Sequence, residues 1–477
     1  MFLRKSTALF LIIVTALAVV SCSDDSDDVV QPGDPFASII ETFGLESLGS
    51  IPYPPDNGFN AQRIALGQLL FFDPILGGES APWIKSAAGK DPYRYRANDV
   101  ACATCHHPTL GFADGRNLGA GVSGAQFNDM DLGPQRVVPG PSLVTGDPVG
   151  AEPRNSPSIL NAAFNGKDSH VPVWDSFQFM DGRVEKGLDE QATFPITSRD
   201  EMAGDAYGPD FTQEAARDSV TERIKNIPEY VARFKQAFPA DVTSADDITI
   251  EIIGKAIGAY EREIITPGSR YDQFIDGNRD VFTAKEKEGF DLFFGKALCG
   301  DCHSGPMLSD FTFRVQGVGD AYEIPDFEGK NGEGGDFGRF HADEIELADQ
   351  KFGFRTQTVR NAELTGPYFH SGSAGSLRDL MDFYNRGGLG PDDISNETLE
   401  ALGIERDPSI RPLGLTDAEM DAVIAFMKTT TAPVQAGPSG LDLTKVPERV
   451  PSGLLPPGIP TPNKPGPYLP GDEAELD

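Results

Sequence analysis

Basic residues are few in this chain of 477 residues: 40 Lys and Arg stand against 73 Asp and Glu, which gives a formal net charge of −33. This deficit excludes nucleic acid as a partner class, because binding to phosphates requires basic patches. The acidic surface either steers a basic partner protein or serves solubility on a cell surface, which is the more ordinary explanation.

Long apolar runs are also lacking. After the N-terminus, no stretch reaches the roughly 20 apolar residues that a membrane-spanning helix needs. Arg4 and Lys5 precede an apolar run over 8–20, which has the plan of a secretory signal. The run leads into Cys22 through a sequence that resembles the lipobox of bacterial lipoproteins. We expect residues 1–21 to be a lipoprotein signal peptide and Cys22 to be lipidated; the alternative is an ordinary signal peptide with a chance cysteine.

The residues that follow Cys22 carry too little apolar surface to fold. Residues 23–28 read Ser-Asp-Asp-Ser-Asp-Asp, and such acidic runs stay unstructured. We interpret residues 22–35 as an acidic tether. The protein is then expected to be exported and anchored by its lipid alone, in the periplasm or on the outer-membrane surface.

Cysteine is scarce, and its placement is informative. The four cysteines besides Cys22 form two Cys-x-x-Cys-His motifs: Cys102, Cys105 and His106, then Cys299, Cys302 and His303. This motif is the attachment signal for c-type haem. Two thioethers fix the edge of the macrocycle, and the histidine reaches the iron as its proximal ligand. We predict two covalent haems, with His106 and His303 as axial ligands.

Three other uses of these cysteines stay open. A Cys₄ zinc site would take both pairs, but it would not need a histidine after each pair. Structural disulfides would suit an oxidising compartment. A thioredoxin-like redox motif would require a βαβ setting, which the sequence does not display.

The regular segments of the sequence are typical of helices. Apolar residues recur at helical spacing within 64–70 and 252–260. Residues 283–286 and 416–419 match the capping box that opens a helix. Pro and Gly are abundant between these segments, which predicts long irregular loops. We expect a mostly α fold with two haem units in tandem.

Further motifs surround the two haem signals in a fixed order. They are Leu66–Pro74, Asn155–Ala162, Asp181–Arg183, Glu190–Gln191, Thr358–Asn361 and Leu364–His370. The ordered series resembles the bacterial dihaem cytochrome c peroxidase family, which includes MauG, over residues 59–430. The resemblance implies two cytochrome c-like helical domains, a peroxide-reactive N-terminal haem, an electron-transferring C-terminal haem and a calcium ion between the domains.

The resemblance also divides the chain. We expect an N-terminal, peroxidatic haem domain over 36–243 and a C-terminal, electron-transfer haem domain over 244–431. A Pro-rich tail, either wrapping or disordered, follows over 432–477. Two insertions, at 78–97 and 117–154, have no counterpart in the family.

The resemblance assigns the residues that handle peroxide. The family's distal glutamate matches Glu201, the general acid/base that moves a proton from the inner to the outer peroxide oxygen. Gln191 matches the glutamine that orients the bound oxygen, and Pro195 matches a proline of the pocket. The alternative is that Glu201 is one of many surface acids.

Many family members cap the first iron with a distal histidine from the loop after the first motif. No histidine lies between His107 and Asn155, and His107 adjoins the proximal ligand. His170 is expected to be a loop or outer residue. We therefore predict a first haem that is five-coordinate or water-bound at rest, as in MauG, with no reductive activation.

The sixth ligand of the family's second haem is Met in the peroxidases and Tyr in MauG, and its position matches Tyr384, fourteen residues after His370. A thioether raises the haem potential, whereas a tyrosinate lowers it. One alternative is Met381, three residues earlier on nearly the same helix face. The other is that Tyr384 is a core aromatic and no ligand.

The family's calcium ligands match the side chain of Asn155 and the backbone carbonyls of Thr365 and Pro367, the oxygen donors that calcium prefers. A turn asparagine and two loop carbonyls are the alternative. The family tryptophan that relays electrons between the haems is replaced by Met180, which puts fast electron sharing in question. Trp83 and Trp174 lie elsewhere in the sequence.

Three functions follow from these features. The first is a peroxidase that reduces hydrogen peroxide with electrons from a small donor protein of the cytochrome c or cupredoxin type. The second is a MauG-like enzyme that uses peroxide to oxidise a protein or organic substrate at long range. The third, of another class, is a non-catalytic electron-transfer cytochrome.

Overall fold

In a computed structural model of the chain, the described residues are 33–77, 100–116, 118–119, 125–129, 133–137, 154–203, 212–319, 336–339, 351–391 and 393–457. The predicted signal peptide, Cys22, almost all of the tether and the insertion at 78–97 lie outside them, as does most of 117–154. Within the described part, no helix has the length and apolarity that crossing a membrane requires.

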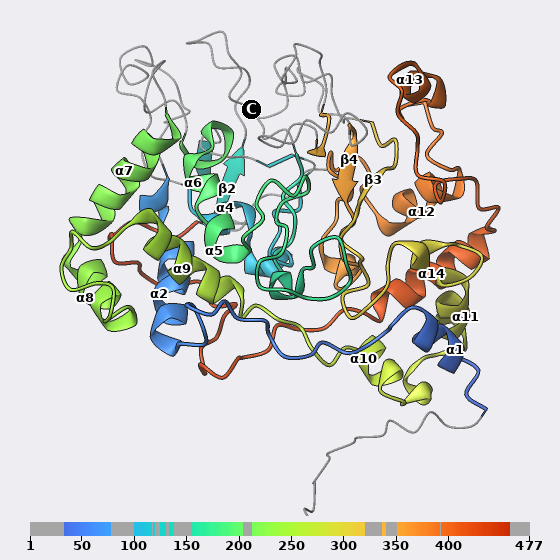
Figure 1. Cartoon of the computed structure of the whole chain (residues 1–477), viewed down its shortest axis with the longest axis horizontal. Helices are drawn as coiled ribbons and strands as arrows, with labels where there is room; N and C mark the ends of the chain where they lie inside the picture. The colour runs from blue at the N-terminus through green and yellow to red at the C-terminus, as the bar shows by residue number, and fades with distance from the viewer. Residues whose placement is uncertain are drawn as a thin grey trace, which may run out of the picture. The chain divides into compact units, whose positions relative to one another are not determined.

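The described part of the chain is mostly helical, as predicted (Figure 1). The longer helices are α2 (Ala61–Phe71), α7 (Gln213–Lys225), α8 (Pro228–Ala237), α9 (Ile250–Glu261), α11 (Ala284–Phe293), α12 (Leu377–Asn385) and α14 (Asp417–Lys428). The shorter helices are α1 (Ala37–Thr42), α4 (Cys102–Cys105), α5 (Leu188–Gln191), α6 (Phe194–Thr197), α10 (Arg270–Ile275) and α13 (Asn396–Ala401), together with the π-helical turn η4 (Arg199–Ala203).

Short 3₁₀ turns and two small sheets complete the described elements. The turns are η1 (Pro74–Leu76), η2 (Pro108–Leu110), η3 (Ala162–Phe164), η6 (Arg279–Val281), η7 (Cys299–Asp301) and η10 (Ala362–Leu364). Each sheet has two antiparallel strands: β1 (Ala125–Asp129) pairs with β2 (Gly133–Val137), and β3 (Phe313–Val315) pairs with β4 (Gly353–Arg355).

The first hydrophobic cluster forms where α2 packs against α9 (Figure 1). Asn60 caps α2 by accepting hydrogen bonds from the backbone N–H groups of the first turn. Gly67 brings the two helices into contact, because a Cβ there would lie 1.9 Å from the carbonyl oxygen of Ala256. This helix pair supports the first Cys-x-x-Cys-His motif, whose Cys102 packs against the cluster.

The second hydrophobic cluster forms in the same way where α11 packs against α14. Both helices open with the predicted capping box, at Thr283 and at Thr416, and these two predictions are confirmed. A Cβ at Gly289 would lie 1.9 Å from the carbonyl oxygen of Ala422, so this pair is also in close contact.

The two clusters interleave along the chain. Phe36, near the N-terminal end of the described residues, belongs to the second cluster. Leu443 and Val450 of the Pro-rich tail belong to the first, so this part of the tail wraps back onto it. Helix α9 also packs in the first cluster, although the expected boundary at 243/244 assigns it to the C-terminal domain. The division between the clusters falls between Ile264 and Tyr271.

Candidate functional site

A cavity of about 470 Å³ opens beside the first Cys-x-x-Cys-His motif. This volume lies within the range of roughly 300–1,000 Å³ that small-molecule and cofactor sites occupy. Its lining includes all of the residues predicted for the first haem and for peroxide handling: Cys102, Cys105, His106, Gln191, Pro195 and Glu201. The fold therefore brings these residues together around one space.

The imidazole of His106 is held in one orientation. Its Nδ1 lies 3.2 Å from the carbonyl oxygen of Phe112 and 3.4 Å from the hydroxyl of Ser156. Burial lowers the pKa of His106 to about 4, so the ring is neutral at physiological pH. A ring that donates its Nδ1–H to a carbonyl leaves Nε2 as the ligand atom, which is how proteins prepare histidine for a metal.

The second motif has the same arrangement. The Nδ1 of His303 lies 2.9 Å from the carbonyl oxygen of Leu308, and burial lowers the pKa of His303. His303, Cys299 and Cys302 line a second cavity, of about 220 Å³. The described residues thus contain two separate sites with one neutral, oriented histidine each.

The alternatives for the cysteines find no support in the described residues. The four described cysteines are free, so no disulfide joins them. The two pairs line different cavities, and no described group of three or more His, Cys, Asp or Glu side chains is arranged to hold a metal ion. Both observations count against a Cys₄ zinc site and leave each pair beside its own histidine, as haem attachment requires.

Gln191 presents an unused hydrogen-bond acceptor to the first cavity. Its Oε1 is buried and has no hydrogen-bond partner among the described residues. Buried polar atoms are nearly always paired, so an unpaired one that lines a cavity indicates a missing donor there. A ligand O–H group bound in the cavity would supply that donor.

Glu201 lies on the π-helical turn η4, a distortion that occurs frequently at functional sites. Its side chain lines the cavity and remains 24% exposed. Its Oε1 lies 3.6 Å from Nη2 of Arg183. A carboxylate that reaches both the cavity and solvent can exchange protons between them. Pro195, on α6, lines the same cavity and carries no ligand atom.

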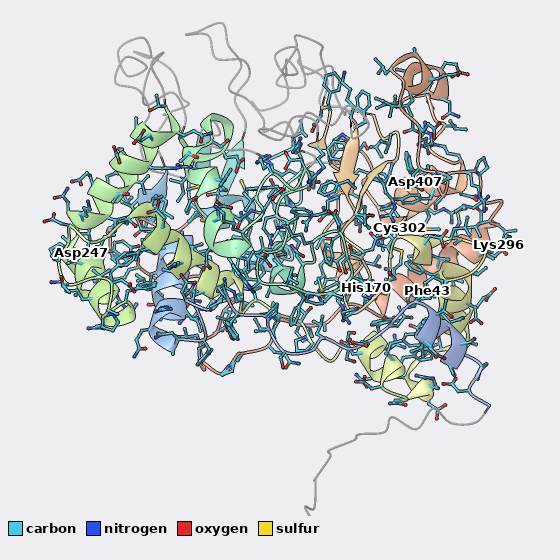
Figure 2. All side chains as sticks on the ribbon, viewed as in Figure 1. Phe43, His170, Asp247, Lys296, Cys302 and Asp407 are labelled. Carbon is cyan, nitrogen blue, oxygen red and sulfur yellow. The ribbon has the colours of Figure 1, made fainter. Side chains whose placement is uncertain are left out.

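Among the described histidines, only His106 lines the first cavity. His107 is buried with its Nδ1 2.8 Å from the hydroxyl of Thr109. His170 lies against Gly305, next to the second motif, in the region where Figure 2 labels Cys302. No described histidine therefore faces His106 across the first cavity; His341 lies outside the described residues.

Both candidates for the sixth ligand reach the second cavity. Tyr384 and Met381, from α12, line it together with His303. The Tyr384 hydroxyl accepts a hydrogen bond of 3.1 Å from Nε2 of Gln316, and burial raises the pKa of Tyr384. A tyrosinate at this depth thus requires a compensating cation such as ferric iron. Met427 of α14 lines this cavity as well.

The predicted calcium ligands Asn155, Thr365 and Pro367 all line the second cavity. The Asn155 side chain lies 3.0 Å from the carbonyl oxygen of Pro367 and 3.2 Å from that of Arg116. Calcium binding itself stays a prediction.

One wall separates the two cavities, and both are lined by Asn155, Ser156, Met180, Arg355 and Thr358. Met180 thus occupies the position between the cavities for which a relay was considered. Trp174 is 41% exposed and lines neither cavity, and Trp83 lies outside the described residues.

Sequence reasoning missed two buried charged residues of these cavities. Arg355, at the end of β4, lines both, and Glu261, at the end of α9, lines the first. Both are buried, and burial raises the pKa of Glu261 to about 8. Buried charges are rare in proteins. The available signal in the sequence was therefore Glu261, a charged residue at the end of the otherwise apolar segment 250–261.

Comparison with known proteins places these cavities in context. Residues 61–280 match the family described as di-haem cytochrome c peroxidase. The cytochrome c551 peroxidase of Pseudomonas aeruginosa is 30% identical over 342 residues, which cover 70% of this chain and 76% of that protein. The methylamine utilization protein MauG of Methylorubrum extorquens is 28% identical over 398 residues, which cover 83% and 85% of the two chains.

Solved structures have the same fold. A MauG-like protein associated with microbial copper homeostasis superposes with a TM-score of 0.58 at 24% identity, over 83% of this chain and 97% of that one. The diheme peroxidase BthA of Burkholderia thailandensis gives a TM-score of 0.55 at 22% identity, over 81% and 93% of the two chains.

Proposed function

Because this chain belongs to the dihaem cytochrome c peroxidase family, we propose that it reduces hydrogen peroxide to water in the first cavity, with electrons delivered through the second. Two electrons and two protons convert one peroxide into two waters. The observation that carries the proposal is the convergence of His106, Gln191 and Glu201 on one cavity.

The residues of both motifs fit a c-type haem. Cys102 and Cys105 would hold one group beside His106, and Cys299 and Cys302 would hold the other beside His303. When bound, each haem supplies a redox-active iron. Two cytochrome c-like domains in tandem are supported by the two helix pairs, α2 with α9 and α11 with α14, which have the same close contact at a glycine.

Glu201 acts in this proposal as the general acid/base. With the haem bound, Glu201 would accept a proton from the inner peroxide oxygen and return it to the outer one, which would leave as water. Its partial exposure lets it exchange protons with solvent. The Gln191 amide oxygen accepts a hydrogen bond from the bound peroxide, which satisfies its buried Oε1 and orients the substrate. Pro195 fills the pocket wall without competing for the iron.

The first iron site is open at rest in this proposal. The support is that no described histidine faces His106 across the cavity. Peroxide can then bind the oxidised protein directly, with no reductive activation. Tyr384 would hold the second haem as its sixth ligand, and the support is its place on the lining of that cavity.

A MauG-like oxidation of a protein or organic substrate is the second candidate. Tyr384 favours it, because a tyrosinate stabilises oxidised iron. Met180 argues against it, because the residue at that position in the wall is not an aromatic side chain that could relay electrons between the cavities. The third candidate, an electron-transfer cytochrome, does not require the convergence of Glu201 and Gln191 on the first cavity.

Calcium, the donor and the membrane anchor complete the proposal. Calcium bound by Asn155, Thr365 and Pro367 would fix the wall between the cavities. The donor is a small basic cytochrome c or cupredoxin, attracted by the net charge of −33. The protein is exported and anchored by a lipid on Cys22, a residue outside the described part.

Steady-state turnover tests the function. The haem-loaded protein is mixed with hydrogen peroxide and a reduced small cytochrome, and oxidation of the cytochrome is followed. Turnover that depends on both reactants supports the peroxidase. Electron exchange with the cytochrome without peroxide consumption would identify an electron-transfer protein instead. Peroxide consumption with no small donor but with a protein oxidised in its place would identify the MauG-like function.

A further inference from the structure

Arg355 is a buried cation in the wall shared by the two cavities. It is 7% exposed and lines both cavities. Its Nη1 donates to the carbonyl oxygen of Phe177 at 2.9 Å, and its Nε has no hydrogen-bond partner among the described residues. No ion pair to Arg355 occurs in the described part of the chain. A buried charge without a counter-charge is costly, so an anion is missing here.

The neighbouring carboxylates are already used. Asp181 is the acid that acts on Arg355, but it binds Arg154 at 2.6 Å and Arg183 at 3.0 Å. Asp336 accepts two hydrogen bonds from Arg154, at 2.5 and 2.8 Å. Arg183 also pairs with Glu201 at 3.6 Å, so none of these carboxylates is left for Arg355. A buried guanidinium with no carboxylate partner among the described residues, in a chain whose net charge is −33, indicates an anion from outside the polypeptide.

The missing anion has a source in both cavities. Every haem carries two propionate carboxylates, and each cavity holds one haem-attachment motif. A planar guanidinium binds carboxylates through parallel hydrogen bonds. We propose that Arg355 is a shared carboxylate-binding site, which holds a propionate group of the haem in each cavity. This inference rests on the haems of the proposed function and names the residue that couples them.

The charge of Arg355 has a direct consequence for electron transfer. A cation in the wall shared by two haem cavities would stabilise an electron added to either haem, so it would raise both reduction potentials. Arg355 is thus a positioning residue, which acts on the irons through the propionates. It also connects the two cavities in a wall where Met180 offers no aromatic relay.

The test compares haem-loaded variants by spectroelectrochemistry, with covalent haem content measured on denatured protein. In Arg355→Gln, both haems should remain attached and both midpoint potentials should fall. Arg355→Lys keeps the charge but loses the planar guanidinium, so its potentials should fall less than those of Arg355→Gln. Arg339→Gln is the matched control: it removes a neighbouring arginine that donates to the carbonyl of Asp181 and lines neither cavity. Its potentials should stay close to those of the unmodified protein.

Several results would overturn the proposal. They are unchanged potentials in Arg355→Gln, a fall at one haem alone, or an equal fall in Arg339→Gln, which would indicate the long-range field rather than a bound carboxylate. If Arg355→Gln loses its haems, Arg355→Lys decides through the propionate bands of the resonance Raman spectrum. Shifted bands support the site, and unchanged bands contradict it. Unmodified protein without covalent haem would contradict the proposed function itself.

Discussion

The two cavities are built on matching local structures. His106 and His303 each place Nδ1 against the carbonyl oxygen of a residue with positive φ, Phe112 at 54° and Leu308 at 49°. Residues other than glycine rarely adopt this backbone conformation, so its occurrence at both sites shows that the two sites share one local structure. Each histidine is thereby turned in the same way towards its own cavity.

The match extends behind the cavities. Asn161 and Asn361 have φ values of 60° and 61°, and both donate from their side chains to the hydroxyl of Thr266, at 2.7 and 2.8 Å. The two helix pairs meet at Gly67 and Gly289, where an added Cβ would lie 1.9 Å from a backbone carbonyl oxygen of the partner helix in both cases. The scaffold is therefore held constant, and the chemistry differs through the few side chains that line each cavity.

The decisive difference lies in one lining residue of each cavity. Pro195 lies seven residues after Leu188, where α5 begins, and Tyr384 lies seven residues after Leu377, where α12 begins. Both line their cavities, but proline has no atom that binds iron whereas tyrosine has a phenol. One scaffold can in this way leave one iron open to peroxide and cap the other for electron transfer.

The largest effect is expected at the first cavity alone. Glu201→Gln removes the proton carrier, and peroxide turnover should fall about 10²–10⁴-fold while both haems stay attached. The measurement is steady-state kcat with a reduced cytochrome. Glu190→Gln is the control, since Glu190 pairs with Lys186 and lines neither cavity. Near-normal turnover in Glu201→Gln would remove the assigned role.

The next effect separates the second cavity from the first. Tyr384→Phe should raise the midpoint potential of the second haem and change its ferric absorption spectrum, because a tyrosinate stabilises the oxidised iron. Met381→Ala should leave both unchanged. A methionine–iron charge-transfer band that disappears in Met381→Ala would instead make Met381 the ligand.

The shared scaffold should respond equally on both sides. Gly67→Ala and Gly289→Ala each force a methyl group into a backbone carbonyl of the partner helix. Each should lower the free energy of unfolding by about 1–3 kcal/mol or more. Chemical denaturation with haem content as a second readout measures this. If only one of the two variants were destabilised, the two helix pairs would not be equivalent.

The smallest effect concerns pH. Burial raises the pKa of Glu261 to about 8, above its unfolded value, so its stabilising contribution is complete at low pH and is lost as pH rises through 8. Met427 lines the other cavity at the matching end of α14. Relative to the unmodified protein at the same pH, Glu261→Met should therefore raise the melting temperature more at pH 9 than at pH 6. An equal change at both pH values would mean that Glu261 does not titrate in this window.

Local signals made much of the site predictable. The Cys-x-x-Cys-His motifs and the capping boxes at Thr283 and Thr416 depend on neighbouring residues, and a sequence displays such relations directly. Gln191, Pro195 and Glu201 were found through the order of motifs in a known family. The structure brings all three to the first cavity.

Long-range packing could not be predicted in this way. The return of Leu443 and Val450 to the first cluster joins segments that no local pattern relates. Arg355 became visible only when its burial and its unpaired Nε were known. A single sequence records which residues are charged, but not which charges end up without a partner.

The EPR spectrum of the resting, fully oxidised protein tests most directly whether one iron is open and the other capped. A five-coordinate or water-bound first haem predicts a high-spin ferric signal, and a second haem capped on both faces predicts a low-spin signal of equal intensity. A spectrum with low-spin signals alone would contradict the open site beside Glu201.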